Sequence, residues 1–395
     1  MWLFIILVIT EILTLVVIRQ HFYDKSWMRY YLLMTLNAAL SIWLWILWFE
    51  ASSYKGIFDE PDHIWVLMNI TGMICAVVIP RIILSIFHFS GWFARLKSGG
   101  HIRHLTNAGL ILSAVLFLVI VIGTLVGRFN FKTENLTVSI KGLKHDLDGF
   151  KIVLISDLHL VSFYHHQDLL EDVILKINEL DPDIIVNTGD FINTGWREFN
   201  RFDTILNKAK GKYGNFAVMG NHDFGTYHPF FTEADRGNNV LLMNKFIASS
   251  GYKVLNDEFT MVNIGDSRIA MIGVMTKGTF PEIIHGDLNK AVKDIYGDDL
   301  KILLAHDPNQ WEKEVTGKTD IDITFSGHTH GMQIGILTKN FRWSPAGLFY
   351  PKWNGLYKEG EQYLIVNRGF GVLGIPFRIW MPPEITVITL VEEKI

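Results

Sequence analysis

Five short apolar runs in the second half of the chain each lead into a group of Asp, His or Asn residues. The runs cover residues 151–156, 183–188, 215–219, 301–305 and 320–325. Their length and their Ile, Val and Leu content are typical of buried β-strands. The polar groups that follow are Asp157-x-His159, Asp190, Asn221-His222-Asp223, His306 and His328-x-His330. We therefore expect the strand ends at one edge of a sheet to collect all of these side chains.

The residue types in these groups indicate a site for two metal ions. Imidazole and carboxylate ligands select Mn, Fe, Co, Ni or Zn over calcium, which prefers oxygen ligands alone. Two such ions about 3.5–4 Å apart can stabilise both the attacking and the leaving oxygen in a displacement at phosphorus. A turn after a strand would explain any single group. A turn gives no reason for His and Asp to follow one strand after another, so we favour the metal site.

The order D-x-H, G-D, G-N-H-D, H and G-H-x-H resembles that of the calcineurin-like metallophosphoesterases over residues 150–395. The C-terminal motifs, among them Asn367-Arg-Gly369 and Pro382-Pro-Glu-Ile385, look like those of the membrane-anchored bacterial branch. Asn193 stands where that family often has Asp, and Met332 where the branch usually has Gly. The resemblance implies an α/β fold, a four-layer αββα sandwich of two mixed β-sheets flanked by helices, with the metals at one end.

Site residues carried over from the resemblance have three roles. It implies one metal held by Asp157, His159, Asp190 and His330, and a second held by Asp190, Asn221, His306 and His328. Asp190 would bridge the two ions. It also implies that His222 donates a proton to the leaving group and that Asp223 orients the His222 ring. The cofactors would be two divalent ions among Mn, Fe, Zn, Co and Ni, with manganese favoured.

The first part of the chain has a different composition. Apolar stretches cover about residues 2–18, 30–48, 64–87 and 107–126. About 20 helical residues, at about 1.5 Å each, cross a hydrocarbon core of about 30 Å. We predict a four-helix transmembrane region at 1–128, a short connection at 129–149 and the catalytic domain at 150–395. A cleaved signal peptide is the alternative for the first stretch, but no basic residue precedes it and no small-residue cleavage site follows it.

Loop charges predict the orientation in the membrane. The loops after the first and third stretches are basic, with Arg19, Lys25, Arg29, Arg95, Lys97 and Arg103, whereas the loop between the second and third is acidic. The positive-inside tendency then puts the N-terminus and the catalytic domain outside the cytoplasm. Two charges lie within the stretches and are functional candidates by default. We expect Glu11 to face the bundle interior and Arg81 to snorkel toward the cytoplasmic surface.

Charge also limits the partners. Residues 131–395 carry 27 Lys/Arg and 34 Asp/Glu, which disfavours nucleic acid as a partner. No protein partner is evident. Aromatic residues are frequent at 224–231 and 341–357, where they either cap the core or form an apolar wall for a lipid.

The leading hypothesis is a membrane-anchored phosphoesterase that attacks a phosphoester with a metal-bound hydroxide, and in which His222 is the proton donor. A lipid or lipid-linked phosphate is one candidate substrate, and the natural substrate stays open. Monoesterase, diesterase and pyrophosphatase activities all stay open. The first alternative is a UDP-2,3-diacylglucosamine pyrophosphatase of lipid A synthesis. The second is a membrane sensor or scaffold without turnover.

Overall fold

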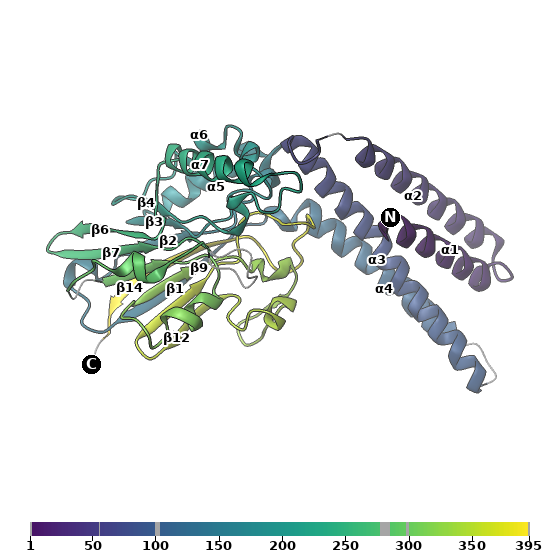
Figure 1. Cartoon of the computed structure of the whole chain (residues 1–395). Coiled ribbons are helices and arrows are strands. Elements are labelled where there is room, and N and C mark those ends of the chain that lie inside the picture. The colour runs from purple at the N-terminus through teal and green to yellow at the C-terminus, as the bar shows by residue number, and fades with distance from the viewer. Residues whose placement is uncertain (1, 55, 99–102, 277–284, 298–299, 394–395) are drawn as a thin grey trace. The chain divides into compact units, whose positions relative to one another are not determined.

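The computed structural model describes residues 2–54, 56–98, 103–276, 285–297 and 300–393 (Figure 1). The side chains of Arg95 and Lys97, whose charges enter the orientation argument, lie outside them. The chain forms two compact units. The helical unit consists of most of the first 127 residues together with Gly374–Ile379, and the catalytic unit consists of Gly56–Trp65, Arg128–Leu373 and the residues from Trp380 onward.

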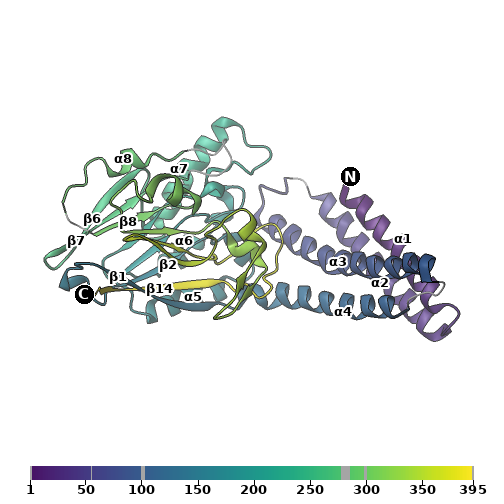
Figure 2. The same cartoon turned by 90° about the horizontal axis from the view of Figure 1, so that it is seen from below.

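Four helices make up most of the helical unit (Figure 2). They are α1 (Trp2–Phe22), α2 (Trp27–Ser53), α3 (Pro61–Ser98) and α4 (Arg103–Leu125). Each contains a segment long and apolar enough to cross a membrane, so the four spans predicted from the sequence are confirmed. Segment Gly374–Ile379 packs with them, because a side chain at Gly72 of α3 would collide with Pro376 and the amide of Arg378 donates to the Gly123 carbonyl of α4.

The two charges inside the spans face the bundle. The carboxylate of Glu11 accepts a hydrogen bond from Trp45 Nε1 of α2 at 3.4 Å. Glu11 therefore faces a neighbouring helix of the bundle, as we expected. Our prediction that Arg81 snorkels to the membrane surface is wrong. The Arg81 side chain is 6% exposed, and Nη2 donates to Asn37 Oδ1 at 2.8 Å and to Ser41 Oγ at 2.7 Å, both on α2. These polar side chains satisfy part of the guanidinium within the bundle, so it does not extend to the membrane surface.

Two mixed β-sheets form the centre of the catalytic unit. The first has the strand order β1-β14-β2-β3-β4-β5 and the second the order β12-β13-β9-β8-β7-β6. The strands of the first are β1 (Lys132–Ile140), β2 (Lys151–Ile155), β3 (Ile184–Asn187), β4 (Asn215–Ala217), β5 (Tyr252–Val254) and β14 (Glu384–Glu392). Those of the second are β6 (Glu258–Ile264), β7 (Ser267–Gly273), β8 (Leu300–Leu304), β9 (Ile323–Ser326), β12 (Gly355–Glu359) and β13 (Gln362–Val366). A separate small hairpin joins β10 (Ile336–Leu337) to β11 (Arg342–Trp343).

Apolar side chains on both faces of each sheet create four layers. Helices α5 (Gln167–Glu179), α6 (Phe202–Leu206) and α7 (Glu233–Ser249) cover the outer face of the first sheet (Figure 1). The inner faces of the two sheets share a second core, to which β2 contributes Leu154 and β9 contributes Phe325. Helix α8 (Leu288–Val292) and the turn Trp311–Val315 cover the outer face of the second sheet. The predicted αββα sandwich is confirmed.

Strand directions determine where the ligand groups meet. Strands β2, β3 and β4 are mutually parallel in the first sheet, and β8 and β9 are parallel in the second. The prediction that one sheet edge collects all five groups is therefore wrong, because three groups follow strands of one sheet and two follow strands of the other. The region predicted as a connection, 129–149, contains β1, which pairs in parallel with β14 along nine residues of the first sheet.

Candidate metal centre

An unusual backbone conformation marks the loops that carry the predicted ligands. Asp157, His159, Asp190, His328 and His330 have positive φ angles, between 40° and 71°. This left-handed region costs a residue other than glycine of order 1–3 kcal/mol, and such residues gather at functional sites. Ordinary turns after strands do not require it. The strain therefore supports a functional reading of these loops.

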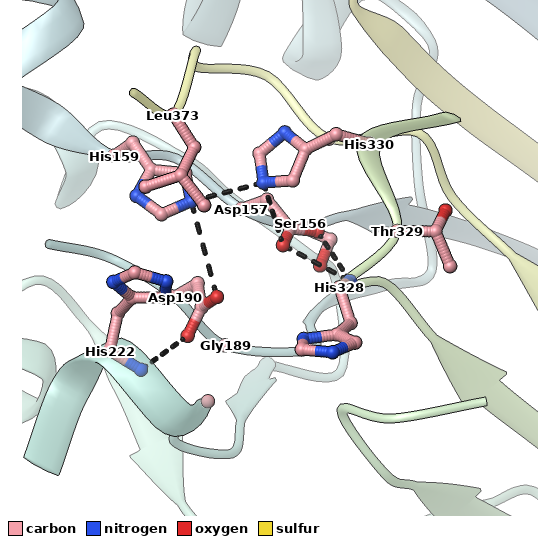
Figure 3. Close-up of polar contacts among 12 residues, drawn as sticks. Ser156, Asp157, His159, Gly189, Asp190, His222, His328, Thr329, His330 and Leu373 are labelled. Atoms are coloured by element: carbon pink, nitrogen blue, oxygen red, sulfur yellow. Dashed lines mark hydrogen bonds and ion pairs between the residues drawn. The ribbon is translucent and has the colours of Figure 1, made fainter. Parts of the chain in front are cut away.

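The first cluster of predicted ligands comprises Asp157, His159 and His330, all of them buried, with ligand atoms within 4.8 Å of one another. His159 Nε2 lies 3.0 Å from His330 Nε2, which lies 3.3 Å from Asp157 Oδ1 (Figure 3). Gly327 makes this approach possible, because a Cβ at that position would collide with Ser156 Oγ beside Asp157. The imidazole nitrogens and the carboxylate converge as ligands of one ion do.

The second cluster comprises Asp190, His306 and His328. His306 Nε2 lies 3.0 Å from Asp190 Oδ2 and 3.1 Å from His328 Nδ1. The same Asp190 oxygen is 3.9 Å from His159 Nε2 of the first cluster. Asp190 thus lies between the two clusters, where a carboxylate that bridges two ions would be needed.

Asn221 tests whether the residues present fit a metal ion. The side chain is 3% exposed, and its Nδ2 donates to the Tyr227 hydroxyl at 3.0 Å. Its Oδ1 is buried and has no hydrogen-bond partner among the described residues. An unpaired buried acceptor costs about 1–3 kcal/mol, and a cation would satisfy it. The six clustered side chains therefore fit two divalent ions in donor type and position, and Asn221 fits in donor type.

Electrostatics keep the two predicted carboxylate ligands ionised. Burial raises the pKa of Asp157, but the charge of His330 and its hydrogen bond outweigh burial and hold that pKa below its ordinary value. Burial likewise raises the pKa of Asp190, and the charges of His306 and His222 lower it further than burial raises it. Burial lowers the pKa of His306, whereas the Asp190 carboxylate raises it to about 10, so an ion that binds Nε2 must displace the proton there. Asp157 and Asp190 can therefore act as anionic ligands at neutral pH.

Acceptors behind the imidazoles select the nitrogen that faces the site. His159 Nδ1 donates to Asn193 Oδ1 at 2.9 Å, and His306 Nδ1 donates to the Thr188 carbonyl at 2.8 Å, so Nε2 of each ring is left for an ion. In His328 the Tyr350 hydroxyl pairs with Nε2 at 2.8 Å, which leaves Nδ1 for the site. The sequence did not indicate these orienting roles. The one available signal was Asn193 at a position where Asp is common.

The environment of His222 differs in one respect from the prediction. Its backbone amide donates to Asp190 Oδ1 at 2.9 Å, which places it beside the second cluster (Figure 3). We had predicted that Asp223 orients the His222 ring, but the ring is hydrogen-bonded to a different residue. His222 Nδ1 donates to the Asn193 carbonyl at 2.6 Å, while the Asp223 carboxylate accepts from the backbone amides of residues 190, 191, 192 and 220. Because these four hydrogen bonds tie the Asp223 carboxylate to the backbone, Asp223 stabilises the loops that carry the predicted ligands.

Another buried carboxylate supports Asn193. Glu198 is 1% exposed and accepts from the amides of Asn193 at 2.8 Å and of Thr194 at 2.6 Å. Burial raises the pKa of Glu198, and these hydrogen bonds offset part of that rise. Because Asn193 contacts both His159 and His222, the Glu198 loop holds a predicted metal ligand and the predicted proton donor in one arrangement.

The aromatic loops contribute to the core, the site and the surface. Phe224 and Trp353 are buried and pack in the core. Tyr227 stacks on His222 with ring centroids 4.2 Å apart, and Tyr350 contacts His328. A third set is exposed and is called the apolar rim here. It comprises Phe341, Trp343, Leu348 and Phe349, each at least 50% exposed. The expected packing in the core is thus confirmed for Phe224 and Trp353, whereas an apolar wall for a lipid stays a prediction.

Comparison with known proteins agrees with this site. The family model for calcineurin-like phosphoesterases matches residues 150–332. An uncharacterized metallophosphoesterase of Bacillus subtilis, YkuE, is 31% identical over 66% of this chain and 85% of its own length. A Danio rerio transmembrane protein with a metallophosphoesterase domain is 30% identical over 66% of this chain and 57% of its own length. The Chlamydia muridarum UDP-2,3-diacylglucosamine pyrophosphatase LpxG is 27% identical over 62% of this chain and 85% of its own length.

A sandwich whose strand ends hold two ligand clusters around one carboxylate defines a metallophosphoesterase domain. The chain belongs to the calcineurin-like phosphoesterase family. It carries that domain together with four candidate membrane helices.

Proposed function

We propose that the protein is a membrane-anchored phosphoesterase that uses two divalent ions, manganese by preference. The ligands would be Asp157, His159, Asp190 and His330 for one ion, and Asp190, Asn221, His306 and His328 for the other. The observation that carries the proposal is the position of Asp190, with one oxygen 3.0 Å from His306 Nε2 and 3.9 Å from His159 Nε2. When bound, the ions would supply an ionised water and stabilise charge on the phosphoryl oxygens.

His222 is the proposed proton donor. The Asn193 carbonyl can only accept a hydrogen bond, so His222 Nδ1 keeps its proton in both charge states of the ring. The proton available to a substrate is therefore the one on Nε2, which has no hydrogen-bond partner among the described residues. In the cationic form Nε2 gives this proton to the departing oxygen and the ring becomes neutral. Tyr227, stacked on the ring, restricts its rotation during the transfer.

The substrate class we propose is a lipid or lipid-linked phosphate. The apolar rim adjoins the ligand loops, because Ser344 Oγ donates to the Gly331 carbonyl at 2.6 Å and Tyr350 contacts His328. Exposed aromatic and aliphatic side chains of this kind mark sites that contact membranes or apolar ligands. A long-chain substrate could place its tail on the rim and its phosphate at the metal centre.

Replacing Trp343 and Phe349 together with Ala is expected to lower hydrolysis of phospholipid or polyprenyl phosphate in vesicles by about tenfold or more. Each side chain would lose burial of apolar surface worth roughly 25 cal/mol per Å², and 1.4 kcal/mol corresponds to a factor of ten. Hydrolysis of a soluble aryl phosphate should not change. Tyr296→Ala, which removes another exposed aromatic side chain, serves as control. Equal losses on both substrates would contradict the role of the rim.

We also propose that the catalytic unit faces away from the cytoplasm, on the basis of the loop charges. An alkaline phosphatase reporter fused after Ile395 should then be active, and a reporter that works only in the cytoplasm should be inactive at the same position. The opposite pattern would favour a second candidate, a pyrophosphatase that acts on a cytoplasmic nucleotide-linked lipid. The similarity to the Chlamydia muridarum pyrophosphatase is the observation that supports this candidate. A scaffold without turnover is not favoured, because no predicted ligand is missing.

A further inference from the structure

A cavity of about 460 Å³ lies within the helical unit, between all four helices. Its walls are mostly apolar and include Ile18 of α1, Leu36 of α2, Val77 of α3 and Phe117 of α4. Ligand pockets in proteins commonly have volumes of 300–1,000 Å³, apolar walls and a few placed polar groups. The proposed phosphoesterase activity makes no use of this cavity, which lies in a different unit from the metal centre.

Two polar side chains line the cavity with unused hydrogen-bond donors. The hydrogen bonds that Arg81 makes to described residues all come from Nη2, so Nε and Nη1 have no acceptor among those residues. Asn37 is 7% exposed, and its Nδ2 is buried without a partner among them. The other polar groups of the wall are occupied, since Ser113 donates to the Pro80 carbonyl and Thr14 to the Thr10 carbonyl.

The charge of Arg81 has no close counter-ion in the described part of the chain. No carboxylate there lies within 4.0 Å of the guanidinium, and the nearby Glu11 carboxylate is engaged by Trp45. Ser41 is close to the midpoint of α2 and Ser113 close to the midpoint of α4, so the polar groups lie deep in the spans. A cation at this depth is costly unless an anion or water compensates it. The cavity therefore combines apolar walls with a guanidinium that no described carboxylate contacts and an unpaired amide donor.

We infer that this cavity binds a single-chain lipid with a carboxylate head, that is, a fatty acid. The Nε and Nη1 groups of Arg81 can each donate a charge-assisted hydrogen bond to a carboxylate, and Asn37 Nδ2 offers a further donor. One negative charge balances the one positive charge of Arg81. Two-chain phospholipids keep their phosphates at the membrane surface, whereas a fatty acid has a head small enough to enter the bundle. Its hydrocarbon tail would occupy the apolar part of the cavity.

The test measures binding of radiolabelled oleate to the full-length protein in nanodiscs, with protein-free nanodiscs as the blank. Oleate should bind saturably, at about one equivalent per chain. Unlabelled methyl oleate, which has the same tail and no charge, should compete at least about tenfold more weakly, because it lacks the charge-assisted hydrogen bonds. This comparison uses the wild-type protein and so does not depend on the folding of a variant.

Two variants localise the binding. Arg81→Gln should weaken oleate binding by about tenfold or more, whereas Arg19→Gln, a matched change at an exposed position of α1, should leave it unchanged. Equal competition by oleate and methyl oleate would overturn the proposal, as would wild-type affinity in Arg81→Gln. Stronger competition by oleoyl lysophosphatidate than by oleate would overturn the assignment of a carboxylate ligand.

Discussion

Asp190→Asn is expected to remove metal from both sites and to reduce phosphoester hydrolysis by at least about 10²–10³-fold. Loss of a single group that stabilises a transition state electrostatically already costs about that much. One oxygen of Asp190 lies near an imidazole nitrogen of each cluster, His306 Nε2 at 3.0 Å and His159 Nε2 at 3.9 Å. An amide of the same shape keeps an acceptor for the His222 amide but loses the charge. Metal content by mass spectrometry and turnover of aryl phosphate mono- and diesters measure the two effects.

Asp172→Asn is the matched control, because Asp172 is exposed on α5 and away from both clusters. It should retain both ions and full turnover. A full complement of two ions in Asp190→Asn would show that this carboxylate does not bridge the sites.

His222→Asn should retain both ions and lose turnover by about 10²–10⁴-fold, the usual contribution of a positioned general acid. The loss should be greatest for substrates with a poor leaving group, such as an alkyl phosphate. It should shrink for p-nitrophenyl phosphate, whose leaving oxygen needs less protonation. Turnover measured on both substrates, together with the metal content, separates proton donation from metal binding.

His145→Asn, a change at an exposed histidine of the catalytic unit, controls for general effects of the substitution. An equal loss on both substrates in His222→Asn would argue against proton donation. Asp223→Asn provides a second contrast. Because Asp223 binds four backbone amides rather than the His222 ring, its replacement should lower the temperature of unfolding along with the activity.

The sequence was informative where local pattern and chemistry coincide. The strand before Asp157 follows from its apolar run, and four apolar stretches of membrane length predicted α1 to α4. The ligand groups could be recognised because Asp and His recur after strands. Six of the seven predicted ligands form the two clusters, and Asn221 directly precedes His222, whose amide donates to Asp190; the coordination of all seven to metal stays a proposal.

Features that depend on tertiary contacts could not be read from the sequence. Nothing local to residues 320–330 indicates that β9 belongs to a different sheet from β2, so the expected single edge was wrong. The Asn193 carbonyl orients the His222 ring, and Asn193 is itself positioned by a hydrogen bond from its amide to the buried Glu198 carboxylate. The burial of Arg81 depends on Asn37 and Ser41, which lie on another helix and carry no charge. A rule based on charge and depth alone favoured snorkelling.

The most direct test of the central claim is a metal titration of the full-length protein. The chelator-treated, metal-free enzyme is titrated with Mn²⁺ while hydrolysis of an aryl phosphate ester is measured. Two ions shared through Asp190 predict no hydrolysis without metal, and activity that rises until about two equivalents are bound per chain. Hydrolysis that persists in the metal-free protein, or that is complete after one equivalent, would contradict a binuclear phosphoesterase.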